Sequence, residues 1–165
     1  MTQTQARVRT FSWAPPGTHM AELVGLNGLE QLRAMRDGRV PRPPIMDLID
    51  MESFEAEPGR VTVTMRAQEF HYNPLGGVHG GVIATLVDTA ASCAVHSTLA
   101  VGELYTTLDL NTRFLRPVTV DSGLLRCEGR VLNRGRRTAL AQAELSDQTG
   151  RLVAHATATC LIMPA

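Results

Sequence analysis

The sequence predicts an α+β fold in which an antiparallel β-sheet wraps around one long central helix. Three observations lead to this prediction. The segment from Gly80 to about Ala100 is small or apolar nearly all round, which is typical of a helix buried on most sides. Four segments after it alternate between apolar and polar residues, as half-buried strands do. The last two of them carry alanines on a single face, which lets a helix approach the sheet closely.

The chain before these elements predicts an N-terminal helical extension. Residues 1–18 contain two prolines and little periodicity, so we expect a loose arm there. An amphipathic helix is predicted from His19 to Arg36, and it ends before Gly38 and three prolines, which cannot continue a helix. A chain of 165 residues has the length of one ordinary domain. We therefore expect the arm and helix in residues 1–42 and the main domain in residues 43–165.

A β-hairpin is predicted at the start of the main domain. Ile45–Ala56 is mixed in composition but typical of a first strand, and Pro58-Gly59 is a turn signal. Val61–Ala67 alternates cleanly, so one face of the second strand is apolar. Residues 68–78 then form a loop that leads into the central helix.

The four alternating segments complete the predicted sheet. They are Leu104–Leu115, Leu124–Leu132, Arg137–Leu145 and Arg151–Met163. Turn residues at 117–123, 133–135 and 147–150 separate them. Because these connections are short, we expect consecutive strands to pair as an antiparallel meander.

Composition and charge exclude several classes of function. The net charge is zero, so no basic field points to nucleic acid. All 16 basic residues are arginine, so a phosphate bound by a side-chain cation must be bound by arginine or protonated histidine. No apolar run approaches the ~20 residues that cross a bilayer, and the N-terminus lacks the apolar core of a signal peptide. We therefore expect a cytoplasmic protein with no membrane partner.

The cysteines and most histidines predict structural roles. The three cysteines form no CxxC pair and lie in apolar segments, so we expect buried reduced thiols: Cys93, Cys127 and Cys160. No group of residues has metal-ligand spacing, so no metal is expected. We interpret His71 as a loop histidine without a partner, His96 as a satisfied residue near the helix end, and His155 as a surface or interface residue.

Asp88 is the most unusual residue of the apolar helix. A buried carboxylate without a partner is costly, so it normally becomes neutral or finds hydrogen-bond donors. The functional interpretation makes Asp88 a catalytic group. The structural alternative places it in a capped or paired position, or on a narrow polar stripe of the helix with neighbouring threonines and Ser92. Asp88 alone leaves both interpretations open.

The residues at the start of this helix favour chemistry. His79-Gly80-Gly81 stands where the loop becomes the helix. The first amides of a helix have no internal partners and lie at the positive end of its dipole. They can stabilise a thioester carbonyl oxygen, which gains charge during nucleophilic attack. The alternative, that glycine is needed here only for a positive φ, is compatible with this function.

The spacing of these residues resembles a known family. Asn73, the triplet at His79–Gly81 and Asp88 are similar to the signature of hot-dog-fold thioesterases of the phenylacetate (PaaI-like) type. Residues 107–117 resemble the strand that follows the central helix in this family, and later turns resemble its last two hairpins. The resemblance covers residues 28–163. It implies the hot-dog fold, with the N-terminal helical extension that the family carries.

The resemblance also implies an activity, hydrolysis of an acyl-coenzyme A thioester. Asp88 would be the general base or the nucleophile. The backbone N–H of Gly80 would polarise the carbonyl, which His79 would help to position, and Asn73 would orient the attacking water or carboxylate. Thr107 would support the water, although Thr106 could take that role instead.

Substrate contacts are expected from Gly81 at the carbonyl and from three arginines at one turn. These arginines are Arg134, Arg136 and Arg137. In a coenzyme A enzyme they could hold the phosphates, although most arginines at turns are merely solvated. Coenzyme A is part of the substrate, so no separate cofactor is expected. The family takes the asparagine and histidine from one protomer and the aspartate from its neighbour. We therefore expect a homodimer or a dimer of dimers with shared active sites.

Two other functions stay open. A hot-dog domain can bind an acyl-coenzyme A without turnover, but such a regulator would usually carry a DNA-binding domain, and the segment before the hairpin looks too short for one. A hot-dog enoyl-coenzyme A hydratase uses an Asp/His pair on a different motif. The acyl group itself cannot be inferred from the sequence.

Overall fold

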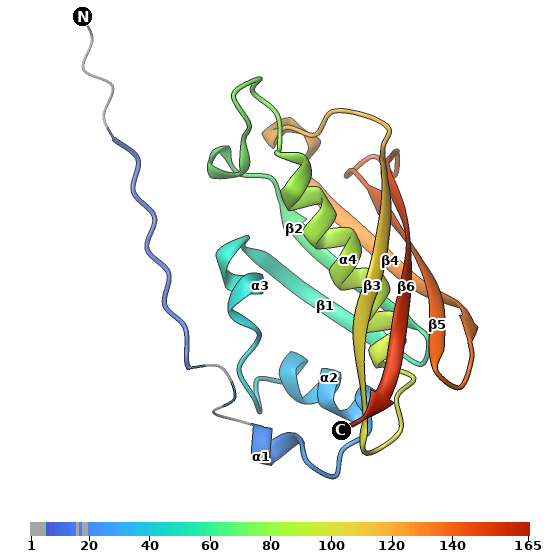
Figure 1. The fold of residues 1–165 in the computed structure, drawn as a ribbon. Helices are drawn as coiled ribbons and strands as arrows, with labels where there is room; N and C mark the ends of the chain where they lie inside the picture. Colours follow the sequence, from blue (N-terminus) through green and yellow to red (C-terminus); the bar gives the residue numbers. More distant parts are fainter. Residues whose placement is uncertain (1–5, 16, 18–19) are drawn as a thin grey trace, which may run out of the picture.

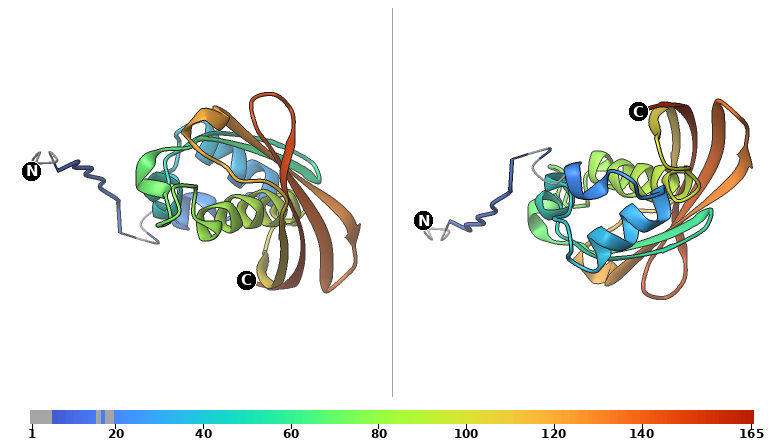
Figure 2. Two further views of the ribbon diagram at one scale, coloured as in Figure 1. Left: turned by 90° about the horizontal axis from the view of Figure 1, so that it is seen from above. Right: turned by 90° about the horizontal axis from the view of Figure 1, so that it is seen from below.

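Six antiparallel strands curl around one long helix, α4 (Gly80–His96), in the computed structural model (Figures 1 and 2). The structure describes residues 6–15, 17 and 20–165. The strands, in sheet order, are β1 (Met51–Glu57), β2 (Arg60–Arg66), β4 (Leu124–Arg134), β5 (Thr138–Ser146), β6 (Leu152–Pro164) and β3 (Glu103–Phe114). The predicted α+β architecture of a sheet around a central helix is confirmed.

The predicted meander is correct for β4, β5 and β6 but wrong for β3. Strand β3 pairs with β6 at the margin of the sheet, where Thr107 lies opposite Cys160 (Figure 1). Strand β2 pairs with β4, with Val61 opposite Gly129, so that side of β4 is already occupied. The connection between β3 and β4 contains η2 (Val120–Ser122). It crosses from β3 to a strand that is not its neighbour in the sheet, so it does not form a hairpin.

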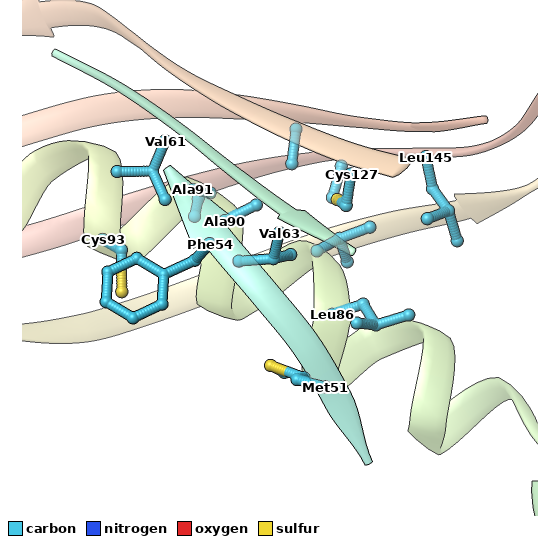
Figure 3. Packing of buried hydrophobic residues seen from close by; sticks show 14 of the residues in the cluster. Met51, Phe54, Val61, Val63, Leu86, Ala90, Ala91, Cys93, Cys127 and Leu145 are labelled. Carbon is cyan, nitrogen blue, oxygen red and sulfur yellow. The ribbon is translucent and has the colours of Figure 1, made fainter. Parts of the chain in front are cut away.

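The core lies between α4 and the inner face of the sheet (Figure 3). The predicted alanine faces are confirmed, because the alternate alanines of β5 and β6 are buried: Ala139, Ala141, Ala143, Ala154, Ala156 and Ala158. Gly129 on β4 brings the two layers closest, since a Cβ at this position would collide with the backbone carbonyl of Ala90. None of the described helices, α4 included, is long and apolar enough to span a membrane.

The predicted helix from His19 to Arg36 is two helices. They are α1 (Met20–Leu23) and α2 (Gly28–Arg36), and His19 lies outside the described residues. The chain breaks at Gly25, which has a φ of +88°, and Asn27 then caps α2 in a reciprocal capping box with Glu30. Gly28 lets α2 pack on the end of α4, because a Cβ there would overlap the carbonyl of His96.

The first predicted strand is partly helical. Helix α3 (Pro44–Leu48) occupies the start of the predicted segment, and β1 begins only at Met51. Pro44 suits the first helical turn, where no backbone donor is needed, and Asp50 turns the chain into β1 with a φ of +60°. The second strand is confirmed as β2, and its Val61, Val63 and Met65 are buried.

The N-terminal arm is extended over residues 6–15 and runs beside the body of the molecule (Figures 1 and 2). Arg7 pairs with Glu69, and Arg9 makes several further contacts. The Arg9 guanidinium donates hydrogen bonds to the carbonyls of Asp47 and Leu48 at the end of α3, and it lies 4.1 Å from the centre of the Phe70 ring. The arm is therefore attached to the same corner of the molecule as the loop before α4.

Candidate active site

Asp88 lies half-buried on α4 and faces β3. Its Oδ1 accepts a hydrogen bond from the Thr107 hydroxyl at 3.2 Å. Thr106 is exposed and pairs with Leu161, so it lies on the opposite face of the strand and is not the partner of Asp88. Burial raises the pKa of the Asp88 carboxyl above its ordinary value, and the Thr107 hydrogen bond opposes this shift.

The two threonines closest to Asp88 on α4 use their hydroxyl protons on the helix backbone. The hydroxyl of Thr85 donates to the carbonyl of Gly81, and that of Thr89 donates to the carbonyl of Thr85. Both hydroxyls are therefore engaged by the helix backbone, which leaves the carboxylate to Thr107. Asp88 borders an open cavity of about 360 Å³, which is lined by Ala84, Thr85, Asp88, Thr107, Leu108, Asp109 and Leu110.

The start of α4 presents one free backbone donor. His79 is the N-cap, and its Nδ1 accepts a hydrogen bond from the N–H of Gly81 at 2.9 Å. Because Nδ1 accepts, the neutral ring carries its proton on Nε2, and the His79 side chain is exposed. The N–H of Gly80 has no hydrogen-bond partner within the described part of the chain. Gly80 rather than Gly81 is therefore the amide that can polarise a bound carbonyl.

Glycine is required here for space and not for backbone freedom. Neither Gly80 nor Gly81 has a positive φ, so that explanation of the Gly-Gly pair is wrong. A Cβ at Gly80 would lie 3.3 Å from the Phe114 ring, and one at Gly81 would lie 3.0 Å from His79 Nδ1. Both distances are tight, so a larger residue would disturb the helix entry.

Asn73 is held by its own loop. Its Oδ1 accepts hydrogen bonds from the N–H groups of Leu75 at 2.9 Å and Gly77 at 3.4 Å. Among the described residues, its Nδ2 amino group has no partner. Asn73 and Gly80 border a second cavity of about 360 Å³, lined by Asn73, Val78, Gly80, Ile83, Phe114, Leu115, Arg116, Pro117 and Val118. The Nδ2 group is thus available to a ligand or water.

The predicted catalytic residues form two separate groups in one chain. Asp88 and Thr107 are together, and Asn73, His79 and Gly80 are together. Gly80 and Asp88 are eight residues apart on one helix, which corresponds to about 12 Å along its axis. A carbonyl bound at the Gly80 amide is therefore out of reach of Asp88 from the same chain.

The three arginines of the β4–β5 turn are not equivalent. Arg134 pairs with Glu103 at 2.9 Å and donates to Thr98, so its charge is already compensated. Arg136 and Arg137 are exposed and border a cavity of about 510 Å³. The cavity is also lined by Gly102, Glu103, Leu161, Ile162, Met163 and Pro164. Leu161 pairs with Thr106, which lies on the face of β3 opposite Thr107.

The remaining histidine and cysteine predictions have mixed outcomes. His96 is confirmed as a satisfied residue, because its Nε2 bonds Gln31 at 2.8 Å and burial lowers its pKa to about 4. His71 is not a loop histidine without a partner, since it is buried and hydrogen-bonded. The cysteines are buried free thiols, as predicted, and burial raises the pKa of Cys93 to about 12.

Two aromatic residues of the region were missed from the sequence. Tyr105 packs against the core beside His96, with ring centres 5.3 Å apart. Phe114 lies over Gly80 and remains 55% exposed in the second cavity. Both belong to β3. The signal for Phe114 in the sequence was an aromatic residue at the end of a predicted strand.

The chain is similar to known proteins. The thioesterase superfamily matches residues 75–154. Human acyl-coenzyme A thioesterase 13 is 32% identical over 101 residues, which cover 61% of this chain and 71% of that protein. The 1,4-dihydroxy-2-naphthoyl-CoA hydrolase of Listeria monocytogenes is 25% identical over 109 residues, which cover 66% of this chain and 87% of that protein.

A solved structure is similar over nearly its whole length. It is a phenylacetic acid degradation-related protein from Ralstonia eutropha JMP134, with 34% sequence identity and a TM-score of 0.72. The likeness covers 79% of this chain and 98% of that one. The chain thus belongs to the thioesterase superfamily and has the hot-dog fold.

Proposed function

We propose that the protein hydrolyses an acyl-coenzyme A thioester to a free carboxylic acid and coenzyme A. The observation that carries the proposal is the Asp88 carboxylate, which has a raised pKa, one hydroxyl donor and an open cavity beside it. A carboxylate in such an environment is a stronger base than an exposed one. The names of the curated relatives, an acyl-coenzyme A thioesterase and a CoA hydrolase, support the substrate class.

In the proposed reaction, the thioester carbonyl oxygen accepts a hydrogen bond from the free Gly80 N–H at the positive end of α4. His79, with its proton on Nε2, can donate a second one. Asp88 either removes a proton from the attacking water or attacks the carbonyl carbon itself. The C–S bond then breaks, and coenzyme A leaves as a thiolate that takes up a proton. In the second route, water hydrolyses the mixed anhydride.

The water needs a second partner, and Asn73 offers one. Its Oδ1 is fixed by two backbone donors, which directs the Nδ2 amino group away from the loop and leaves it unpaired among the described residues. Nδ2 can donate to the oxygen of the attacking water, or to the Asp88 carboxylate itself.

Such a site requires two chains. Because about 12 Å separates Gly80 from Asp88 along α4, the carboxylate must come from a second copy. Strand β3 offers the surface for this copy: it is a sheet edge of 12 residues, with Leu104 and Leu108 44% and 57% exposed. An unpaired edge of this length is a template for another strand. We therefore place the active site between two protomers, with dimers of dimers as a further possibility. A fully active monomer in analytical ultracentrifugation at assay concentration would contradict this arrangement.

The coenzyme A part of the substrate carries phosphates, and Arg136 and Arg137 are exposed cations without an ion-pair partner among the described residues, at the border of the cavity beside Leu161 and Met163. We assign the phosphates to these two residues. Arg134 is assigned a supporting role, since Glu103 already neutralises it. Gly81 supports the N-cap through His79 and thereby the carbonyl site.

A panel of aromatic, medium-chain and long-chain acyl-coenzyme A esters, assayed with a thiol reagent, tests the proposal. Release of coenzyme A with at least one ester is expected. Hydration of enoyl-coenzyme A without thiol release would favour the hydratase alternative. Tight binding of an ester in calorimetry, with no turnover of any ester, would favour the non-catalytic binding protein.

A further inference from the structure

Beyond the catalytic groups, His71 is a buried histidine in the short helix η1 (Glu69–His71). Its side chain is only 3% exposed, and both ring nitrogens are hydrogen-bonded. Nδ1 accepts from the N–H of Gln68 at 3.0 Å, and Nε2 lies 3.0 Å from the carbonyl oxygen of Ile49. Since Nδ1 accepts a hydrogen bond and the Ile49 carbonyl can only accept one, Nε2 must carry the proton and donate it to that carbonyl in a hydrogen bond. The surroundings therefore select one neutral tautomer.

The backbone of His71 is the base of the loop that carries the catalytic groups. Its carbonyl accepts a hydrogen bond from the N–H of His79 at 2.8 Å. The next residue, Tyr72, forms a β-bridge with Val78, so the chain runs antiparallel to itself across this loop. Asn73 lies inside the loop, and its N–H donates to Gly77 at 2.8 Å. The placement of Asn73 relative to the Gly80 amide thus depends on where His71 sits.

The bond to Ile49 connects this base to another part of the fold. Ile49 is the C-cap of α3 and is followed by Asp50, which turns the chain into β1. The Phe70 ring packs edge-on against His71, with ring centres 4.2 Å apart, and the Arg9 guanidinium lies over the Phe70 ring. Among the described residues, no side chain from 72 to 79 hydrogen-bonds the α3–β1 corner. The His71 ring makes it directly.

We infer that His71 is a positioning residue for the thioesterase reaction, because it holds the Asn73 and Gly80 donors at a fixed separation. It borders neither cavity of the site, so it touches no substrate. The inference rests on the proposed function. A displacement of catalytic groups by about 1 Å can cost about 100-fold in rate, so loss of the ring should reduce turnover.

The test uses the full-length protein and the ester that the wild type hydrolyses best. His71→Phe keeps an aromatic ring and removes both hydrogen bonds, and we expect kcat to fall about 10- to 100-fold with KM nearly unchanged. His71→Gln offers a side-chain amide that can still donate to Ile49, so it should recover part of kcat. His155→Phe is the control for the same change of side chain, since His155 is half-buried on β6 and is not part of the loop from His71 to His79.

Mixing of impaired variants distinguishes the two halves of the site. His71→Phe mixed with Asp88→Asn should regain activity, because one of the two sites then has intact donors and an intact carboxylate. His71→Phe mixed with Asn73→Ala should stay inactive, because both donor sets are damaged. Should His71→Phe not fold, His71→Asn replaces it, since its carbonyl can accept from Gln68 while the bond to Ile49 is lost.

Wild-type kcat in a folded His71 variant would overturn the inference, and so would recovery with Asn73→Ala but not with Asp88→Asn. A fall in melting temperature with unchanged kcat would make His71 merely structural. These outcomes are separate from failure of the proposed function, in which the wild type itself releases no coenzyme A from any ester.

Discussion

Replacing Thr107 by valine removes the hydroxyl that donates to Asp88 and keeps the shape of the side chain. In the wild type this hydroxyl lies 3.2 Å from Asp88 Oδ1 and favours the ionised carboxylate. A base must be deprotonated to act. Loss of the donor therefore raises the pKa of Asp88 further, and activity falls at any pH on the acid side of the profile.

The size of the effect follows from the geometry of the bond. Hydrogen bonds to charged groups contribute about 1.5–3 kcal/mol, but 3.2 Å is long for two oxygens and Asp88 is only half-buried. We therefore expect about 1 kcal/mol, which corresponds to about a fivefold loss in kcat/KM on the acid limb. At higher pH, where both proteins are ionised, the difference should shrink.

The assay is the pH dependence of kcat/KM, measured by release of coenzyme A. Thr106→Val is the matched control, because Thr106 is the neighbouring residue on the opposite face of β3. The acid limb of Thr107→Val should move to higher pH, while that of Thr106→Val should not. Superimposable profiles for Thr107→Val and the wild type would refute the role of the hydroxyl, as would equal shifts in both variants.

Three further predictions concern stability and substrate binding. Gly129→Ala should lower the free energy of unfolding by about 3 kcal/mol, the upper end for overpacking, because the added methyl group meets helix backbone that cannot rotate away. Both variants are measured by urea titration. Gly77→Ala is the control and should change the free energy of unfolding little, because its Cβ would lie 3.4 Å from its nearest neighbour. Asp147 accepts hydrogen bonds from Thr149 and Arg151, which hold its pKa at about 2, below its ordinary value of 3.8. The ionised Asp147 carboxylate therefore stabilises the fold above its ordinary pKa, and this stabilisation is lost as the pH falls toward 2. Asp147→Asn should lower the melting temperature at neutral pH and lower it less in acid. A difference in melting temperature that does not depend on pH would contradict this. Arg136→Ala should raise KM for acyl-coenzyme A several-fold at low salt and less at high salt, without affecting an acyl-cysteamine thioester that lacks phosphates; equal damage to both substrates would remove Arg136 from phosphate recognition.

The strands could be predicted from the sequence because alternation is a local property. The alanines of β5 and β6 and the valines of β2 have a period of two residues, and each of these segments is a strand. The partner of β3 could not be predicted in this way. Its position depends on β2, which occupies the side of β4 that a simple meander would have used.

The predicted helix boundaries were wrong where a single residue decides the local conformation. The chain breaks at Gly25, but the apolar residues on both sides of it keep a helical spacing. The break therefore could not be seen in the sequence pattern. Pro44 was interpreted as the end of a helix, whereas it starts α3. Proline fits both places, and only the surrounding structure distinguishes them.

The candidate site was predictable as a set of residues and not as an arrangement. The spacing from Asn73 to Asp88 was visible in the sequence, but their separation into two groups results from the position of Asp88 two turns along α4. His71 was missed because its partner, the Ile49 carbonyl, lies 22 residues away in the chain. A buried histidine cannot be distinguished from an exposed one when both stand in a polar loop.

The turnover number of Asp88→Asn tests the central claim most directly. The amide is nearly the same shape as the carboxylate and can still accept from Thr107, so folding and substrate binding should persist. Removal of a positioned base should reduce kcat by about 100-fold or more while KM changes little. Turnover of acyl-coenzyme A close to that of the wild type, in purified and folded Asp88→Asn, would contradict the assignment of Asp88 as the catalytic carboxylate.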